Sequence, residues 1–503
     1  MSKFDDLLKC TEDEREHIES TLDVSTILKE IELVNSAKST LNEDQTNAFD
    51  GIIEFLSNPK KELATIVGYA GTGKTYLISK IVSAVQGKVA MTAPTNKAVK
   101  VLSDNRSPDL SGVSYATIHK LLALTLKRVF PKQGKPYQVL SQMWRKEPTV
   151  NEYSILIIDE ASMLDDELFH MLIKIKQKKL KIIFLGDGAQ IPPVGKPDTI
   201  PLIKSEQEKY NISVFTLDRI MRQKEGSGIL KTAGSIRDKR FLHSTDVIQE
   251  RVNTNDVVFV QRYNEQQTQF MLNKMQELFT SDEFDKDPNY CKLIAWRNDT
   301  VNGFNDVIRK FIYKTNRLDY VMPGEKLIAD TPVIVNNNIV FNTSDEFTVI
   351  SYIEKVFTYI RPDNKEEREE RDNLLWDDKD DSIIDLKKKQ FIMPYLETIV
   401  DYCGAKSKID ILLPAGFEPL KWAISDVFKH KLNEEYGFLS DRFAKVKYNY
   451  AITAHKSQGS TYKNVFIIED DMDKNPNIVE RNRIKYTAVS RASENLFIVS
   501  KRN

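Results

Sequence analysis

The octet GYAGTGKT, residues 68 to 75, constrains the fold of this chain more than any other stretch. It directly follows the apolar run LATIV and leads into the helix-like segment YLISKIVSAV. Glycines in such a loop let the backbone turn tightly and point its N–H groups inward, where the positive end of the following helix also attracts anions. The strand, the loop and the helix together predict a phosphate cradle at the edge of a parallel sheet.

The side chains of the octet have separate expected tasks. Lys74 can reach the β and γ phosphates of a nucleoside triphosphate, and Thr75 offers a hydroxyl to the accompanying Mg²⁺. The octet predicts a nucleotide site without indicating which work the nucleotide drives. The residues expected to bind the nucleotide here are Gly68, Tyr69, Ala70, Gly71, Thr72, Gly73, Lys74 and Thr75.

Apolar runs alternate with helical segments from about residue 39 to 200, as in LATIV, KVAMTA, SILIID and KIIFLGD. This alternation is typical of a parallel sheet covered by helices on both faces. A second set of runs, CKLIAW, KNVFIIE and NLFIVS, predicts a second α/β domain. Between its parts, residues 325 to 440 contain Val- and Ile-rich pieces with Asn turns, which predict an inserted antiparallel β domain.

These patterns predict the domain boundaries. We expect an acidic N-terminal extension at 1–38 and a first α/β domain at 39–200 with an insert at about 120–150. The second α/β domain is expected at 201–324 and 441–503, interrupted by the β domain at 325–440. A charge-rich block at 364–381 is better explained as a solvated helix or loop than as a partner-binding device.

Composition excludes several classes of protein. The 503 residues are 41% hydrophobic and 29% charged, which fits several globular domains, and no apolar run approaches the ~20 residues of a membrane span. The acidic N-terminal residues lack the apolar core of a secretion signal, so we expect a cytoplasmic protein without membrane contact. Three cysteines at unpaired spacings argue against disulfides and against a cysteine zinc site. The net charge of -1 neither supports nor excludes a nucleic-acid partner.

Two adjacent acids follow the buried-looking strand LIID, at the end of the sheet where open α/β folds place their ligand chemistry. We expect Asp159 to hold the Mg²⁺ directly or through water, and Glu160 to orient or deprotonate the water that attacks the γ phosphate. After the next strand, Asp187 and Gln190 lie on a loop stiffened by two prolines, where Gln190 is expected to sense the γ phosphate. With the octet, these residues predict a nucleoside triphosphatase.

Hydrolysis also requires cations that offset the charge developing on the transferred phosphoryl group, and arginine is the best suited. Arg222 in TLDRIMRQ and Arg491 in YTAVSRASENL are the two candidates, and both lie outside the first α/β domain. Supplied from the second domain, they would let hydrolysis open and close a cleft between the two domains.

Ten motifs occur in order: LNEDQTNAF, GYAGTGKT, TAPTNKAVKVL, ATIHKLL, LIIDEASM, GDGAQIPPV, LDRIMRQ, AWRNDTVNGFN, ITAHKSQGSTY and YTAVSRA. This set, from about residue 39 to 503, resembles the superfamily 1 helicases, and the wording TIH, DEASM and ITAHKSQG is most similar to their RecD-like branch, subgroup B. The resemblance implies two RecA-like P-loop NTPase domains, with a hairpin pin in the first and a small SH3-like β-barrel in the second. It also implies ATP and Mg²⁺ as cofactors and 5′ to 3′ movement on single-stranded DNA.

Further roles follow only from this resemblance. Gln45 is expected to contact the adenine base. Hydroxyls, amides and a basic group on loops suit sugar and phosphate contacts, which hold a strand without reading its sequence. For His119 and His455, a place in the core or at a helix cap is the alternative. The residues implied to contact DNA are Pro94, Thr95, Asn96, Thr117, His119, Thr453, His455 and Lys456.

The stretch after His119 mixes Lys and Arg with Phe130, Tyr137 and Trp144 around a Pro/Gly turn. The family has an insert near this point that separates the duplex, and basic residues with aromatics suit backbone attraction and base stacking. This stretch is therefore expected to form the strand-separating pin, with a purely structural hairpin as the alternative.

The combined expectation is an ATP-dependent DNA helicase that unwinds duplex DNA in replication, recombination or repair. Its expected partners are single-stranded and duplex-junction DNA, alongside proteins such as a single-strand binding protein. Three alternatives stay open: the motor subunit of a recombination nuclease complex, a nucleic-acid-binding switch set by ATP, and an RNA motor.

Overall fold

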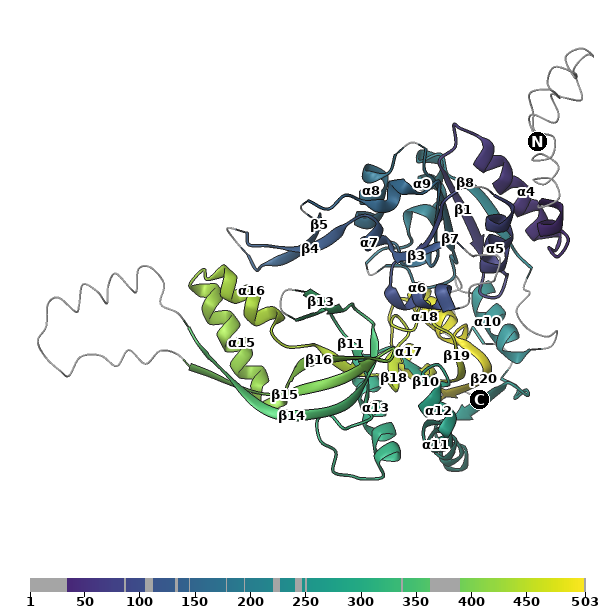
Figure 1. The fold of residues 1–503 in the computed structure, drawn as a ribbon. Coiled ribbons are helices and arrows are strands. Elements are labelled where there is room, and N and C mark those ends of the chain that lie inside the picture. The colour runs from purple at the N-terminus through teal and green to yellow at the C-terminus, as the bar shows by residue number, and fades with distance from the viewer. Residues whose placement is uncertain are drawn as a thin grey trace, which may run out of the picture.

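The computed structural model describes residues 34–85, 87–104, 112–131, 134–143, 145–177, 179–193, 195–219, 227–239, 247–248, 251–335, 338–361 and 390–501. Most of the N-terminal extension, the charged block at 364–381, Trp144 and Arg222 lie outside these residues. The chain forms two RecA-like domains and an inserted lobe, which Figure 1 shows at the upper right, lower right and left, respectively.

The first RecA-like domain is built on a six-stranded parallel sheet with the order β3-β2-β6-β7-β1-β8. Odd-numbered residues of β6 and β7 join one apolar cluster and even-numbered residues join another, because neighbouring side chains of a strand point to opposite faces. The sheet is therefore buried on both sides, as predicted. Its strands are β1 (Leu63–Gly68), β2 (Val89–Ala93), β3 (Ser114–Thr117), β6 (Ile155–Ile158), β7 (Lys181–Gly186) and β8 (Ser213–Leu217).

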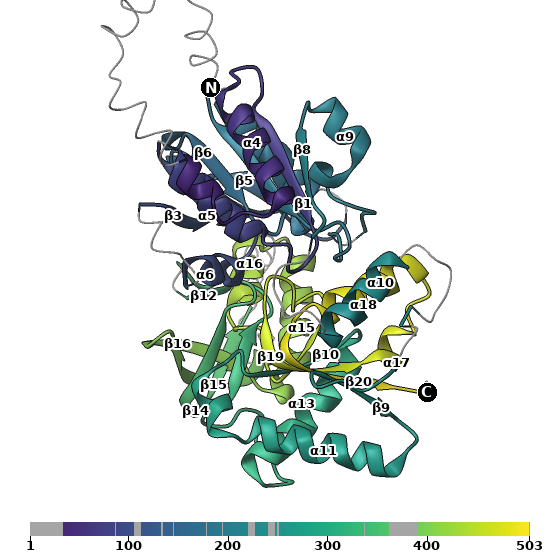
Figure 2. The same ribbon diagram turned by 90° about the vertical axis from the view of Figure 1, so that its right-hand side faces the viewer.

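The boundary expected at residue 200 is too early. β8 pairs with β1, from Ala64 opposite Ser213 to Gly68 opposite Leu217, so the first domain continues at least to Leu217. Helices cover both faces of the sheet (Figure 2). They are α4 (Glu43–Ser57), α5 (Lys74–Ala84), α6 (Asn96–Asp104), α7 (Ile118–Leu121), α8 (Asp166–Ile175) and α9 (Lys204–Lys209).

The second RecA-like domain has a five-stranded parallel sheet with the order β18-β10-β19-β20-β9. This confirms the second α/β domain that the three apolar runs predict. Its strands are β9 (Val257–Gln261), β10 (Cys291–Ala295), β18 (Ala451–Thr453), β19 (Tyr462–Ile468) and β20 (Ala492–Ser500). Its helices are α10 (Gly228–Asp238), α11 (Glu265–Phe279), α12 (Asp282–Lys286), α13 (Asn298–Tyr313), α17 (Glu469–Met472) and α18 (Ile478–Val489).

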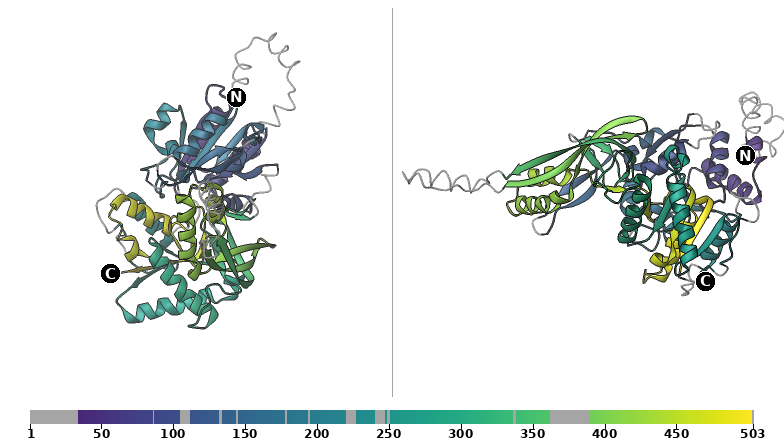
Figure 3. Two further views of the ribbon diagram at one scale, coloured as in Figure 1. Left: turned by 90° about the vertical axis from the view of Figure 1, so that its left-hand side faces the viewer. Right: turned by 90° about the horizontal axis from the view of Figure 1, so that it is seen from below.

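The inserted lobe is antiparallel, as predicted, with the strand order β16-β15-β14-β11-β17. β14 and β15 extend away from both RecA-like domains as a long ribbon (Figure 3). The strands are β11 (Lys326–Ala329), β14 (Glu346–Ile360), β15 (Gln390–Tyr402), β16 (Ala405–Leu412) and β17 (Val446–Tyr448), with a separate pair of β12 (Val333–Val335) and β13 (Asn338–Phe341).

The lobe differs from the expected all-β insert in two respects. Two helices, α15 (Pro414–Lys429) and α16 (Asn433–Asp441), bury an aromatic-rich cluster against the β14–β15 ribbon. In addition, β17 pairs with β11, so the sheet of the lobe continues past the expected end at residue 440. Among the helices of the described residues, none combines the length and the apolar character that a membrane crossing requires.

A buried ion cluster stabilises the second RecA-like domain. Glu469, which is 1% exposed, accepts hydrogen bonds from Arg251 at 2.8 and 3.1 Å and from the Lys485 Nζ at 2.7 Å. Burial by itself would raise the pKa of Glu469, but the charges of Lys485 and Arg251 outweigh burial and lower the pKa to about 2. The ionised carboxylate is therefore the stable form in the folded protein.

Replacing Glu469 with Gln is expected to lower the unfolding free energy by about 3 kcal/mol, since it leaves two buried cations without this carboxylate. Urea unfolding at pH 7 measures the change. Because the folded-state pKa lies below the ordinary 4.5, this contribution is complete above pH 4.5 and is lost as the pH falls toward 2. The control Glu418→Gln breaks an exposed pair with Lys421 and should cost less than about 0.5 kcal/mol; equal losses for both variants would contradict the prediction.

Candidate nucleotide site and DNA-contacting loops

The octet forms the tight loop that the sequence predicts, between the end of β1 and the start of α5. Gly71 and Gly73 have φ of 85° and 82°, in the left-handed region that favours glycine. A Cβ at Gly73 would lie 2.5 Å from the Gln45 Nε2, so a side chain at this position would also clash. The backbone can therefore approach phosphates closely, as an anion site requires.

The Lys74 ammonium group folds back over this loop. It donates hydrogen bonds to the carbonyl oxygens of Gly68 at 2.6 Å and Tyr69 at 3.1 Å. Both acceptors are weak partners for a cation compared with phosphate oxygens, since a phosphate also contributes opposite charge. The arrangement fits a triphosphate, with Lys74 able to exchange the carbonyls for phosphate.

Gln45 lies against the same loop and is 1% exposed. Its Nε2 donates to the Thr72 carbonyl at 3.2 Å, and its backbone N–H donates to the Asn42 side chain in a capping box at the start of α4. The capping box fixes the side chain beside the cradle. Contact between Gln45 and the adenine base remains a prediction.

Asp159 and Glu160 follow β6, which lies between β2 and β7 in the sheet, with β1 on the far side of β7. Asp159 accepts a hydrogen bond from the Glu160 N–H at 2.8 Å, and Glu160 has φ of 52°, an uncommon conformation for a residue with a side chain. Burial and the neighbouring Asp159 raise the pKa of Glu160, whereas Arg491 and Lys74 oppose that rise. A raised pKa makes Glu160 a better proton acceptor.

The donor set fits Mg²⁺ held jointly with a nucleotide. No group of three or more His, Cys, Asp or Glu side chains that could hold a metal occurs among the described residues. Mg²⁺ in nucleotide sites is typically held by one or two protein oxygens, substrate phosphates and waters. The Thr75 hydroxyl and the Asp159 carboxylate, which come from the start of α5 and the end of β6, provide such a set.

The loop after β7 links the cradle to the second domain. Asp187 and Gln190 are 2% and 5% exposed, and the Gln190 Oε1 has no hydrogen-bond partner in the structure. The Ile191 N–H donates to the Thr487 hydroxyl at 3.2 Å, and the Ile191 carbonyl accepts from the Gln458 side chain at 2.7 Å. The predicted sensor Gln190 therefore adjoins a residue that is bonded to the second domain on both sides.

Arg491 follows α18 in the second domain and is 5% exposed. Its guanidinium donates to the carbonyls of Thr487 and Ser460, each at 3.1 Å, and to the Ser490 hydroxyl at 3.0 Å. Its charge also acts on Glu160 in the first domain. The structure thus brings Arg491 to the acids as predicted, although it lies on a different domain.

A cavity of about 290 Å³ lies between the cradle and the second domain, beside the direct contact of Tyr486 with Ala70. Tyr69, Ala70 and Gly71 line one side, and residues of α10 and α18 line the other. The guanidinium of Arg237 lies 4.4 Å from the centroid of the Tyr69 ring, so a second cation from the second domain faces the cradle. In Figure 2, α10 and α18 lie on the side of the second domain that faces the first.

The loops implied to contact DNA follow strands of both sheets. Pro94, Thr95 and Asn96 connect β2 to α6, Thr117 caps α7 through the Lys120 N–H, and Thr453 ends β18. Burial lowers the pKa of His119 and of His455, against the opposing charges of Asp165 and Glu480. Both imidazoles are therefore neutral at pH 7 and can hydrogen-bond to a strand without adding charge.

Acids of the inserted lobe face two of these loops, which the sequence did not predict. Asp345 accepts a hydrogen bond from the Asn96 side chain, and Asp330 forms ion pairs with Lys456 and with Lys447, the latter at 3.2 Å. The pairing of Lys456 with a carboxylate indicates that phosphates of a bound strand would compete with Asp330 for the same ammonium group.

The predicted pin is a hairpin of β4 (Leu124–Val129) and β5 (Tyr137–Gln142) that projects from the first domain over α16 (Figure 1). Arg128 forms a two-pronged ion pair with Asp441 of α16 at 2.9 and 3.3 Å. Phe130 packs edge-on against Tyr436, with 5.6 Å between the ring centroids. The side of the hairpin is thus anchored to the inserted lobe, while Tyr137 remains 53% exposed.

Two features of the interface were missed by sequence reasoning. Tyr486 contacts the cradle although it lies in the motif YTAVSRA, from which only Arg491 was selected. Arg483 donates to the Pro197 carbonyl at 2.7 Å and forms an ion pair with Asp198 at 3.0 Å. Both residues lie on α18, which is rich in Arg, Lys and Asn although its residues from Arg481 to Val489 are buried. A polar helix of this kind is ordinarily expected at the surface, so the sequence did not indicate that it packs between the domains.

Comparisons with known proteins agree with this arrangement. A model described as an AAA domain matches residues 40–255, and a UvrD-like helicase C-terminal domain matches residues 448–499. The chain is 27% identical to an uncharacterised protein of Acanthamoeba polyphaga mimivirus, over 90% of this chain and 99% of that protein. It is 28% identical to the ATP-dependent DNA helicase dda of Enterobacteria phage T4, over 58% of this chain and 62% of that helicase.

A third relative is the RecBCD enzyme subunit RecD of Buchnera aphidicola, which is 24% identical over 86% of this chain and 70% of that subunit. The first family model spans the first RecA-like domain and continues into the start of the second, and the other model lies in the C-terminal part of the second. The charges of Lys74 and Arg491, from the two domains, act together on Glu160 after β6. The chain is thus similar to the RecD- and Dda-like superfamily 1 helicases.

Proposed function

We propose that this ATP-dependent DNA helicase moves 5′ to 3′ along single-stranded DNA and separates the duplex at its β4–β5 hairpin. The observation that carries the proposal is that Lys74 of one domain and Arg491 of the other both lie close enough for their charges to act on the buried Glu160. A site divided between two domains couples the state of the nucleotide to the distance between the domains.

In the proposed cycle, ATP lies in the cradle with Lys74 on its phosphates and Gln45 beside the base. Thr75 and Asp159 would hold Mg²⁺, which would supply positive charge that offsets the charge of the phosphates. Glu160 takes a proton from the attacking water, and Arg491 stabilises the charge that develops on the transferred phosphoryl group. Gln190 senses the loss of that group, and the contacts of Ile191 transmit the change to the second domain.

The DNA grips lie on both sides of the same cleft. Pro94, Thr95, Asn96, Thr117 and His119 move with the first domain, whereas Thr453, His455 and Lys456 move with the second. Opening and closing therefore change the distance between the two grips, which allows one to advance while the other holds. Since these loops carry hydroxyls, amides and neutral imidazoles, they suit sugar and phosphate contacts of any sequence.

The experiment that tests the proposal uses duplexes with a single-stranded tail at either the 5′ or the 3′ end, with and without ATP. We expect unwinding only with ATP and only of the 5′-tailed duplex. Unwinding of the 3′-tailed duplex alone would reverse the proposed direction. Matched RNA tails form a further arm, and stronger ATPase stimulation by RNA than by DNA would identify an RNA motor instead.

Replacing Arg128 with Ala is expected to slow unwinding about fivefold while DNA-stimulated ATP hydrolysis stays unchanged. The ion pair with Asp441 is partly exposed, so its loss should weaken the contact between the hairpin and α16 by about 1 kcal/mol. The hairpin would then be displaced more easily by the duplex, which slows strand separation. Unwinding and ATPase rates measured on the same forked duplex give the ratio of base pairs opened to ATP consumed.

Asp441→Ala should reproduce the effect, because it removes the other half of the pair. Lys127→Ala deletes the same charge from the adjacent exposed position and should retain the wild-type ratio. If Arg128→Ala and Lys127→Ala reduce unwinding equally, the hairpin acts through its charge rather than through its anchoring on α16.

A further inference from the structure

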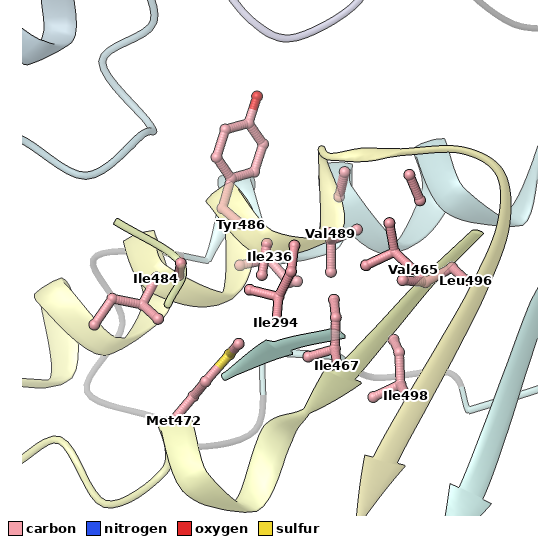
Figure 4. Close-up of a cluster of buried hydrophobic side chains, with 14 of the residues drawn as sticks. Ile236, Ile294, Val465, Ile467, Met472, Ile484, Tyr486, Val489, Leu496 and Ile498 are labelled. Carbon is pink, nitrogen blue, oxygen red and sulfur yellow. The ribbon is translucent and has the colours of Figure 1, made fainter. Parts of the chain in front are cut away.

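Tyr486 has its ring in an apolar cluster of the second domain and its hydroxyl on polar groups of the first domain. The residue lies on α18, is 2% exposed, and its ring packs into the apolar core of the second domain. Figure 4 shows Tyr486 next to Ile236, Ile294 and Val489, with its hydroxyl pointing away from the cluster. The cluster around the ring comes mostly from the second domain and also includes Ala189 and Ile191 of the first, and the hydroxyl extends from it toward the cradle.

That hydroxyl makes two hydrogen bonds, and both reach the first domain. It donates to the Asp187 Oδ2 at 2.9 Å and accepts from the Ala70 N–H at 3.1 Å. Ala70 belongs to the phosphate cradle, and Asp187 begins the loop that carries Gln190. A single atom of the second domain thus connects the cradle to the sensor loop.

The position of Arg491 depends on the same helix. The three hydrogen bonds of its guanidinium go to residues of the second domain, one of them to the Thr487 carbonyl next to Tyr486. Arg491 therefore moves with α18 as one body. Its placement toward Glu160 is set by how α18 docks on the first domain.

The docking contacts repeat along one side of α18. Arg483 binds Pro197 and Asp198, Tyr486 binds Ala70 and Asp187, and Thr487 binds the Ile191 N–H. Spacings of three and four residues place these side chains on one face of the helix. Of the three, the hydroxyl of Tyr486 is the one that contacts the cradle.

We propose that Tyr486 is a positioning residue for ATP hydrolysis, whose hydroxyl docks α18 on the Ala70 amide and the Asp187 carboxylate and so holds Arg491 in register with the nucleotide. The inference rests on the proposed function and deepens it. The aromatic ring fixes the hydroxyl at low cost in side-chain entropy, because a buried Tyr has few rotamers to lose. Loss of the hydroxyl leaves the fold of each domain intact and removes the contact of α18 with the cradle, while the contacts of Arg483 and Thr487 remain.

Tyr450 provides a matched control. It is 1% exposed in the second domain, its hydroxyl donates to the Glu325 carboxylate at 2.9 Å, and it accepts from the Lys326 N–H at 3.2 Å. The pattern of one carboxylate and one amide is the same as that of Tyr486. The partners of Tyr450, however, lie near the inserted lobe and away from the cradle.

The experiment compares Tyr486→Phe with Tyr450→Phe in the full chain. We expect Tyr486→Phe to lower the kcat of DNA-stimulated ATP hydrolysis about tenfold, as the loss of a hydrogen bond to a charged group predicts. Its KM for ATP, its affinity for a fluorescent ADP analogue and its affinity for single-stranded DNA should stay within about twofold of wild type. Tyr450→Phe should lower the Tm while retaining the wild-type kcat.

A second arm tests the route through Asp187. In an Asp187→Ala background, removal of the Tyr486 hydroxyl should cost much less than tenfold, because the two residues act through one contact. A kcat for Tyr486→Phe within twofold of wild type, or a fall in ADP affinity as large as the fall in kcat, would overturn the inference. Absence of DNA-stimulated hydrolysis in the wild type would instead refute the proposed function itself.

Discussion

Lys74→Ala is expected to lower the rate of DNA-stimulated ATP hydrolysis about 1000-fold and to abolish unwinding. The Lys74 ammonium lies over the cradle, bonded at 2.6 Å to the Gly68 carbonyl, and no other lysine belongs to the octet. Removing a preorganised cation from the place where charge develops typically costs about 100- to 1000-fold in rate. Weaker binding of ATP is expected to add to this loss, because we propose that Lys74 also contacts the phosphates before the reaction.

Steady-state hydrolysis with saturating single-stranded DNA measures this effect, and binding of a fluorescent ATP analogue separates affinity from rate. Lys80→Ala is the matched control, since Lys80 lies on the same helix with its ammonium 5.5 Å from the centroid of the Tyr76 ring. It should remain within about twofold of wild type. Unwinding that persists in Lys74→Ala would refute the assignment of the octet as the site that powers movement.

Glu160→Gln is expected to reduce hydrolysis about 1000-fold while ATP and single-stranded DNA still bind. A glutamine keeps the size and polarity of the side chain but cannot accept the proton from the attacking water, and such a proton transfer contributes about 100- to 10000-fold. The variant should therefore hold ATP in a closed cleft, in contrast to Lys74→Ala. Single-turnover hydrolysis and a filter-binding assay distinguish the two behaviours.

The pH profile of the wild type provides a further measurement on Glu160. Burial and Asp159 raise its pKa above the ordinary 4.5, so the proton-accepting form is lost as the pH falls through that raised value. We expect kcat to decline on the acidic side and this limb to disappear in the residual activity of Glu160→Gln. Glu167→Gln, an exposed carboxylate in the first turn of α8, should keep the wild-type profile. A wild-type kcat for Glu160→Gln would exclude Glu160 as the base.

Much of the fold could be predicted because local patterns agree with it. The strands of both parallel sheets follow apolar runs, which must be buried on two faces, and the hairpin β4–β5 flanks a Pro/Gly turn. The predicted domain boundary was wrong at β8, and the predicted all-β insert was wrong because it contains the helices α15 and α16. SVFTL has no motif to mark it, and whether it closes one domain or opens the next is decided by its pairing with β1.

The candidate site divides in the same way. The positions of Lys74 and Thr75 at the start of α5 and of Asp159 and Glu160 after β6 could be predicted, because each expected task requires one residue type at a fixed distance from a strand end. The hydroxyl of Tyr486 could not be, because its partner Ala70 lies 416 residues earlier in the chain. The pairing of Asp330 with Lys456 is likewise a contact between an inserted lobe and a distant motif.

The sequence by itself determined which residues are expected to act and in what order, that is, a phosphate cradle, two acids, a polar loop and arginines in the order of a helicase. Residue type and spacing along one strand or helix are sufficient for that purpose, since they fix local geometry. Only the tertiary structure decided which surfaces meet across the cleft, namely α18 on the cradle and the hairpin on α16. The physical reason is that domain contacts depend on the packing of whole elements, whose relative positions no local pattern contains.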